Sequence, residues 1–105
     1  PRQEAAAAWT GTLTFDLRLG APRPLTQTRG VVRPLVAALR RAFDVAVAET
    51  GSLDLLRRTE IGVAVVAADA GRCIELLDAA ERLVAARSEV ELLATRRRLY
   101  GPEDE

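Results

Sequence analysis

The segment from residue 9 to residue 19 alternates between two kinds of side chain, and it constrains the fold more than any other part of the chain. One set is mainly apolar and comprises Trp9, Gly11, Leu13, Phe15, Leu17 and Leu19, and the polar set comprises Thr10, Thr12, Thr14, Asp16 and Arg18. Successive side chains of a β-strand point to opposite faces of its sheet. The alternation therefore predicts a strand with one buried face and one exposed face.

A helix is predicted after this strand. Glycine and proline residues at 20–24 end the strand, and the apolar residues beyond them then follow helical spacing. The apolar positions of this helix are Val32, Leu35, Val36, Leu39 and Phe43. Thr26 or Thr28 is the expected N-terminal cap. Pro34 fits such a helix only within its opening turns, where its missing N–H removes little hydrogen bonding.

The middle of the chain, from Asp44 to Ala68, has the pattern of two strands joined by a loop. Residues 45–49 and 61–66 are largely apolar and of strand length, whereas residues 50–60 are mostly polar. This pattern predicts a strand, a polar loop and a second strand.

A second helix and a final strand complete the predicted fold. Asp69 is the expected N-cap of the helix, which runs to about residue 87, and residues 89–95 form the strand. The positions on its inner face are Ile74, Leu77, either Ala80 or Glu81, and Val84. The resulting order, βαββαβ, is that of the ferredoxin-like α+β fold. We expect a four-stranded antiparallel sheet in the spatial order 4-1-3-2 with both helices on one face.

The domain organisation expected from the sequence is simple. A chain of 105 residues holds one compact domain, which we place at residues 9–100. Residues 1–8 are expected to form a flexible leader and residues 101–105 an acidic tail.

Composition restricts the possible functions. The 15 basic residues are all arginine and balance 15 acidic ones, so the long-range attraction on which non-specific nucleic-acid binding depends is weak. Without histidine or lysine there is no Ser–His triad, imidazole metal site or Schiff base. We therefore expect no catalytic residue, no metal and no cofactor, although carboxylate chemistry stays open. No segment has the length of a membrane span, so a cytoplasmic location without membrane contact is expected.

The predicted topology brings three segments to one end of the sheet: the end of the first strand, the start of the first helix and the loop between the middle strands. The candidate anion- or partner-binding residues there are Arg18, Arg23, Arg29, Asp54, Arg57 and Arg58. A helix N-terminus and guanidinium groups both favour a bound anion. The alternative is that Arg58 pairs with Asp54, Glu49 or Glu60 and only holds the loop in place.

Other side chains have simpler interpretations. Residues 96–98, all arginine, point alternately to the two faces of a strand and so do not form one patch. Cys73 is expected to be a small core residue. Trp9 and Tyr100 are expected to lie close together. Phe15 falls on the apolar side of its strand, which argues against an RNA-recognition sheet with aromatic platforms.

A homodimer is also expected, through the exposed sheet face or a sheet edge. The threonines of the first strand lie on this face beside residues such as Ala64 and Val66. Such a weakly polar sheet face is a reasonable dimer surface.

Three segments in order, at 11–19, 24–35 and 47–66, resemble the YlxP-like family of small bacterial proteins of unknown function. The resemblance extends over about residues 9–100. It implies a ferredoxin-like fold, and genes of this family often neighbour those for translation initiation and ribosome maturation. The chain departs from the family at Pro24–Arg29, where lysines are usual, and at Ser52 and Leu53, where His and Gln are usual.

Two functions therefore remain open. The first is a non-enzymatic accessory protein that associates with ribosomal RNA or a translation protein, as the family context implies. The second is a diverged small-molecule-binding or tailoring protein of specialised metabolism, with its site at the loop after residue 19 and the loop at 50–58. The loss of lysines counts against the first, and the absence of histidine counts against an enzyme.

Overall fold

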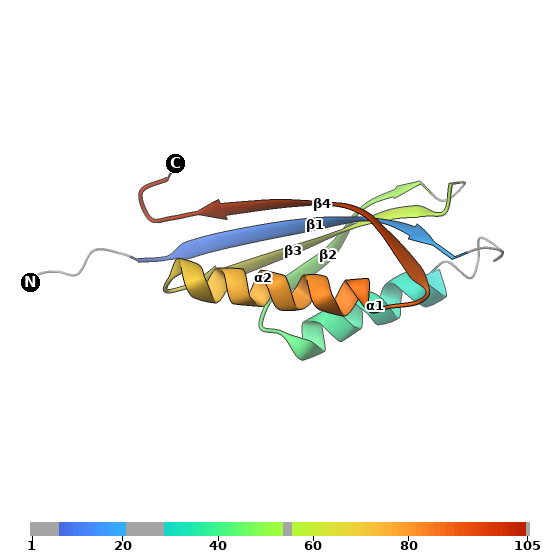
Figure 1. Ribbon diagram of the computed structural model, residues 1–105, viewed down its shortest axis with the longest axis horizontal. Helices are drawn as coiled ribbons and strands as arrows, with labels where there is room; N and C mark the ends of the chain where they lie inside the picture. Colours follow the sequence, from blue (N-terminus) through green and yellow to red (C-terminus); the bar gives the residue numbers. More distant parts are fainter. Residues whose placement is uncertain (1–6, 21–28, 54–55, 105) are drawn as a thin grey trace, which may run out of the picture.

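The computed structural model describes residues 7–20, 29–53 and 56–104. Its elements in chain order are β1 (Trp9–Leu19), α1 (Arg29–Ala42), β2 (Ala46–Leu53), β3 (Arg58–Ala67), α2 (Ala70–Ala85) and β4 (Val90–Tyr100). The strands form one antiparallel sheet in the order β2-β3-β1-β4. Both helices lie on the same side of it (Figure 1). The predicted ferredoxin-like arrangement is thus confirmed, including its strand order.

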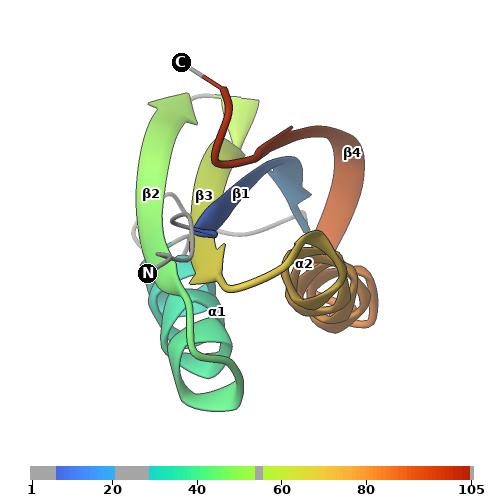
Figure 2. The same ribbon diagram turned by 90° about the vertical axis from the view of Figure 1, so that its left-hand side faces the viewer.

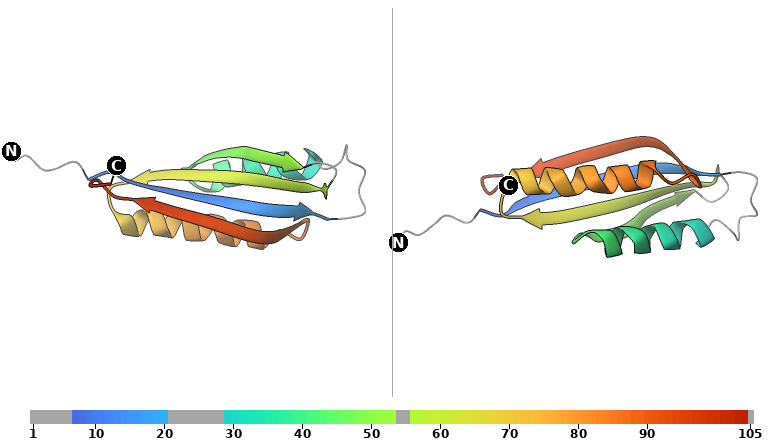
Figure 3. Two further views of the ribbon diagram at one scale, coloured as in Figure 1. Left: turned by 90° about the horizontal axis from the view of Figure 1, so that it is seen from above. Right: turned by 60° about the horizontal axis from the view of Figure 1, so that its bottom comes forward.

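The core lies between the sheet and the helix layer. The inward-facing residues of β1 are buried, and Leu13, Phe15 and Leu17 are completely inaccessible to solvent. Figure 2 shows α1 on the β2 side of the molecule and α2 beside β1 and β4. The opposite face of the sheet is covered by no element of the described chain, as the left view of Figure 3 shows. We call this surface the open face.

The hairpin between β2 and β3 is longer than its composition predicts. The polar residues from 50 to 60 favour a loop, but β2 continues to Leu53 and β3 already begins at Arg58. A register shift between Glu49 and Gly51 lets the strand ladder continue past Thr50. Thr59 is only 3% exposed, and its hydroxyl donates a hydrogen bond to the Glu49 carboxylate and lies 3.1 Å from the carbonyl oxygen of Gly51.

Strand β4 also exceeds its predicted end at residue 95 because β1 offers a partner along its whole length, with Thr10 opposite Tyr100. The ends of β1 and β4 therefore meet, as expected for Trp9 and Tyr100. The two side chains nevertheless take opposite faces, and the Trp9 ring packs over Gly101 on the helix side. A Cβ atom at residue 101 would lie 2.8 Å from this ring, which explains the glycine there.

Helix α2 begins as predicted, with the Asp69 carboxylate accepting a hydrogen bond of 2.8 Å from the backbone N–H of Arg72. Its buried face differs slightly from the predicted one. Ile74 is 41% exposed, whereas Leu76 and Cys73 are buried. The helix is rotated so that Cys73, Leu76, Leu77, Ala80 and Val84 face the core, whereas Ile74 lies at the edge of this face.

Helix α1 begins at Arg29, so Pro34 lies in its second turn, near the N-terminus as required. The cap candidates Thr26 and Thr28 lie outside the described residues. None of the helices that the structure describes is long and apolar enough to cross a membrane.

Candidate functional site

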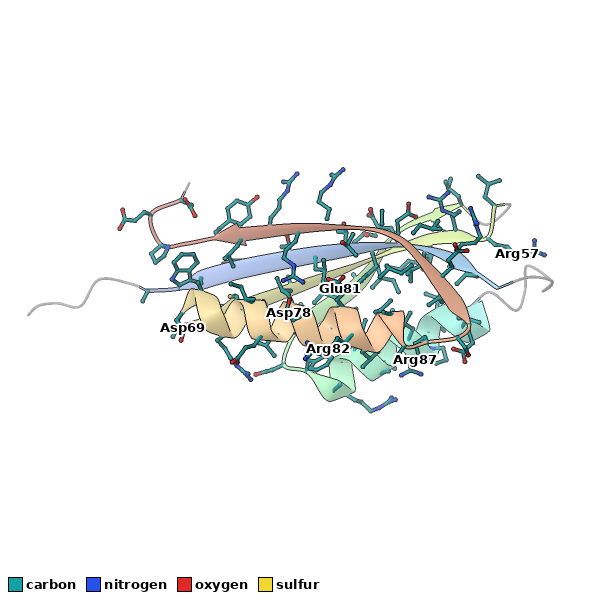
Figure 4. All side chains as sticks on the ribbon, in the orientation of Figure 1. Arg57, Asp69, Asp78, Glu81, Arg82 and Arg87 are labelled. Atoms are coloured by element: carbon teal, nitrogen blue, oxygen red, sulfur yellow. The ribbon has the colours of Figure 1, made fainter. Side chains whose placement is uncertain are left out.

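Three of the six predicted binding residues meet at one end of the sheet. Arg18 and Arg58 are direct neighbours across β1 and β3, and the N–H of Leu19 donates a 2.8 Å hydrogen bond to the carbonyl of Arg57. Arg57 has a positive φ of 52°. Residues other than glycine adopt such a value mainly in turns. Figure 4 labels it at the tip of this end of the molecule. Arg23, Asp54 and the side chain of Arg29 lie outside the described residues.

Two arginines of this cluster, Arg18 and Arg58, already have acidic partners. Arg58 forms two hydrogen bonds to the Asp16 carboxylate, with a distance of 3.2 Å from Nε to Oδ1. Arg18 lies 3.4 Å from Glu91, and both of these side chains are more than half exposed. Asp16 was not among the partners expected for Arg58. It is available because it lies one position along the same sheet face from Arg18, the cross-strand neighbour of Arg58.

A small pocket adjoins the Asp16–Arg58 pair. It has a volume of about 240 Å³, and its lining includes Gly51, Leu53 and Thr59. The pocket is thus bounded by two carboxylates, those of Asp16 and Glu60, and by the Arg58 guanidinium, which is paired with Asp16. It has room for a small polar molecule, but the second carboxylate disfavours an anion.

A stronger concentration of charge lies on α1. This helix contains four arginines and no acidic residue, and among its described side chains Arg33, Arg40 and Arg41 are exposed. Arg33 and Arg40 are seven residues apart, which places them on one helix face about 10 Å apart along the axis. Arg33 and Arg41 form no side-chain ion pair or hydrogen bond within the described ranges.

A groove runs between this face of α1 and the edge strand β2. It has a volume of about 430 Å³ and is lined by Val32, Arg33, Val36, Ala37, Arg40, Ala48 and Glu49. The Arg40 guanidinium is held in the groove by a 2.7 Å hydrogen bond to the carbonyl of Val47. The one carboxylate there, that of Glu49, accepts a hydrogen bond from Thr59. We call this surface, together with the adjoining Arg41, the α1 groove.

The α1 groove is the feature that sequence reasoning missed. The signal was present, because the sequence from 29 to 42 contains arginines and no acid. It was obscured by the neutral total charge. The compensating acids lie elsewhere, and Glu75, Asp78 and Glu81 are on α2.

The arginines at 96–98 divide between the two faces of the sheet, as predicted. Arg97 points to the helix side and bonds to Asp78 at 2.8 Å and Glu81 at 3.1 Å, both labelled on α2 in Figure 4. Arg96 and Arg98 point to the open face, opposite Thr14 and Thr12 of β1. Neither makes an ion pair with any residue that the structure describes.

The remaining chemical groups are structural. Cys73 is fully buried in the core, as expected, and its thiol lies 3.5 Å from the carbonyl oxygen of Trp9. Within the described ranges, no group of three or more Cys, Asp or Glu side chains is placed to hold a metal ion.

The fold and surface define a small ferredoxin-like protein with a bare sheet on one side and a basic helix on the other. The chain belongs to the family described as "Protein of unknown function (DUF503)", whose sequence profile matches residues 10–97. A comparison with curated proteins finds no match.

Proposed function

We propose that the protein is a non-enzymatic accessory protein of the cytoplasm that binds RNA of the translation apparatus through the α1 groove. The observation that carries this proposal is the concentration of arginine on α1 without a single acidic residue. Guanidinium groups bind phosphate with directed hydrogen bonds, and they provide most of the affinity of proteins for nucleic-acid backbones.

The neutral total charge is compatible with such binding. Electrostatic interactions at physiological ionic strength decay over about 8 Å, so a phosphate at α1 responds mainly to nearby charges. The described acids of α2 are partly neutralised by Arg97 and Arg72. The affinity for RNA would accordingly be modest. It would depend on where the arginines lie on the surface rather than on the total charge of the protein.

The resemblance to the YlxP-like family supports the choice of RNA over other polyanions. Genes of that family often neighbour those for translation initiation and ribosome maturation. The sheet itself is a poor RNA platform, since Phe15 is completely buried and β1 presents threonines to the open face. A contact through the helix layer avoids this difficulty.

The test is a titration of fluorescently labelled ribosomal RNA fragments with wild-type protein and with the double variant Arg33→Glu/Arg41→Glu. We expect binding by the wild type and its loss in the variant. With about three phosphate contacts, the slope of log K against log salt should be roughly −2 to −3 between about 50 and about 200 mM salt.

Arg82→Glu is the matched control. Arg82 is an exposed arginine on α2 without an ion-pair partner in the described chain. Replacing it with glutamate therefore changes the net charge of the protein by the same amount as Arg33→Glu does. Equal weakening by Arg82→Glu and by Arg33→Glu alone would reduce the effect to net charge and contradict a site on α1. The absence of RNA binding by the wild type would overturn the proposal.

The pocket beside Asp16 and Arg58 supports a second candidate, a small-molecule-binding protein. Its volume of about 240 Å³ lies below the range of roughly 300–1,000 Å³ that is usual for ligand sites. A metabolite that copurifies with the protein and is released by Arg58→Ala, in the absence of RNA, would favour this function.

A further inference from the structure

The open face is a surface that no other element of the described chain covers. Its central strands present small or weakly polar side chains over one part, among them Thr12, Thr14, Gly62 and Ala64, and charged ones at one end, namely Asp16, Arg18, Arg58 and Glu60. Val66 is 72% exposed and Tyr100 is 41% exposed, and both flank Thr10 on this face. Apolar side chains exposed in this way on a sheet indicate a surface that another molecule covers.

The size of the open face suits a protein partner. Strands of about ten residues rise about 3.4 Å per residue, and four strands lie about 4.8 Å apart, which gives roughly 600–700 Å². A specific interface buries about 600–1,000 Å² on each partner. The open face alone therefore reaches the area that a stable complex needs.

The shape of the open face is complementary to itself. The β2 and β3 half is low, with Ala46, Ala48, Gly62 and Ala64 lining a shallow apolar groove of about 330 Å³. The opposite edge, β4, is high, because Arg96, Arg98 and Tyr100 project from it. A two-fold axis parallel to the strands, between β1 and β3, brings the high edge of one copy over the low half of another.

The same operation brings the charged residues of the two faces together. Because Asp16 and Glu60 are register partners, Asp16 of one copy lies over Glu60 of the other, and the Arg58 and Arg96 guanidinium groups beside them have to neutralise these carboxylates. Glu60 lies next to the low half, and its carboxylate accepts a 2.7 Å hydrogen bond from Thr50 but has no ion-pair partner in the described chain. Arg96 is likewise unpaired within the described ranges. The two-fold operation places Arg96 over Ala48 of the second copy, one row of residues from Glu60 of that copy.

We propose that the protein is a homodimer formed by face-to-face packing of two open faces, with Arg96 of each copy paired with Glu60 of the other. This arrangement leaves α1 and its arginines on the outer side of each protomer, and the α1 groove meets the covered face only at Ala48. The arrangement therefore does not depend on the proposed RNA binding. A nucleic acid is a poor occupant of this face because its central strands present no aromatic residue on which a base could stack.

Charge reversal at Arg96 tests the dimer directly. We expect sedimentation equilibrium to show a dimer for the wild type, and the variant Arg96→Glu should weaken it by about tenfold or more, because it adds a carboxylate beside Asp16 and Glu60 in each of the two contacts.

Two further variants sharpen the result. Ala48→Arg fills the apolar groove from an exposed position and should prevent dimerisation without unfolding, as circular dichroism would show. Arg41→Glu, on the helix layer, should leave the dimer unchanged. A wild type that stays monomeric up to millimolar concentration would overturn the proposal, as would a dimer that Arg96→Glu and Ala48→Arg leave intact.

Discussion

Individual side chains on α2 show how burial, rather than hydrophobicity, determines their contribution to stability. Leu77 and Ile74 are both large and apolar and lie three positions apart on one helix. Leu77 is completely buried against the sheet, whereas Ile74 is 41% exposed. Helical spacing alone places both on the apolar side, and only the packing against β1 and β3 separates them.

This difference leads to a prediction for a pair of variants. Leu77→Ala should lower the free energy of unfolding by about 2–5 kcal/mol, because it removes buried methyl groups and leaves a cavity. Ile74→Ala should lower it by less than about 1 kcal/mol, because much of that side chain is already in water. Urea denaturation followed by circular dichroism measures both. Similar losses for the two variants would mean that α2 packs on a different face.

At the scale of single elements, helix α2 depends on the cap at its N-terminus. The Asp69 carboxylate accepts the backbone N–H of Arg72, one of the donors that the helix itself cannot satisfy. Asp69→Ala should lower the free energy of unfolding by about 1 kcal/mol, within a range of about 0.5–2 kcal/mol. Asp69→Ser keeps a capping oxygen and is the control, with little loss expected. Thermal melts of the two variants would show the difference, and equal melting temperatures would contradict a role for the cap.

The elements also show what could be predicted from the sequence. Strand β1 and the start of α2 were predictable because alternation and capping are local patterns. The extension of β2 beyond Thr50 was not, because it depends on a shifted register with β3. The pairing of Arg58 with Asp16 likewise needs the neighbouring strand to be placed first. The basic character of α1 was visible in the sequence but was hidden by the total charge.

At the scale of the whole molecule, the two proposed surfaces lie on opposite sides of the sheet. The open face is on one side and the helix layer on the other (Figure 3). A face-to-face dimer would therefore carry two α1 grooves pointing outward. Such a particle could contact two segments of one RNA at the same time, whereas a monomer could contact only one.

This geometry predicts a difference between short and long RNA. The dimer-disrupting variant Arg96→Glu should bind a short fragment, sufficient for one α1 groove, as well as the wild type does. It should bind a long ribosomal RNA more weakly by roughly tenfold or more, since the second contact is no longer linked to the first. Titrations of the short and the long RNA with wild-type protein and with Arg96→Glu measure this difference. Equal weakening for both lengths would place Arg96 in the RNA site itself and contradict the separation of the two surfaces.

The contact between Trp9 and Gly101 gives the molecule a built-in optical reporter. The chain contains one tryptophan, and its indole lies over the residue that directly follows β4, at the seam where the first and last strands meet. Emission from this ring should shift to longer wavelength when the end of β4 separates from β1 and water reaches the indole. Intrinsic fluorescence thus monitors fraying of this seam separately from the far-ultraviolet signal of the helices, without any added dye.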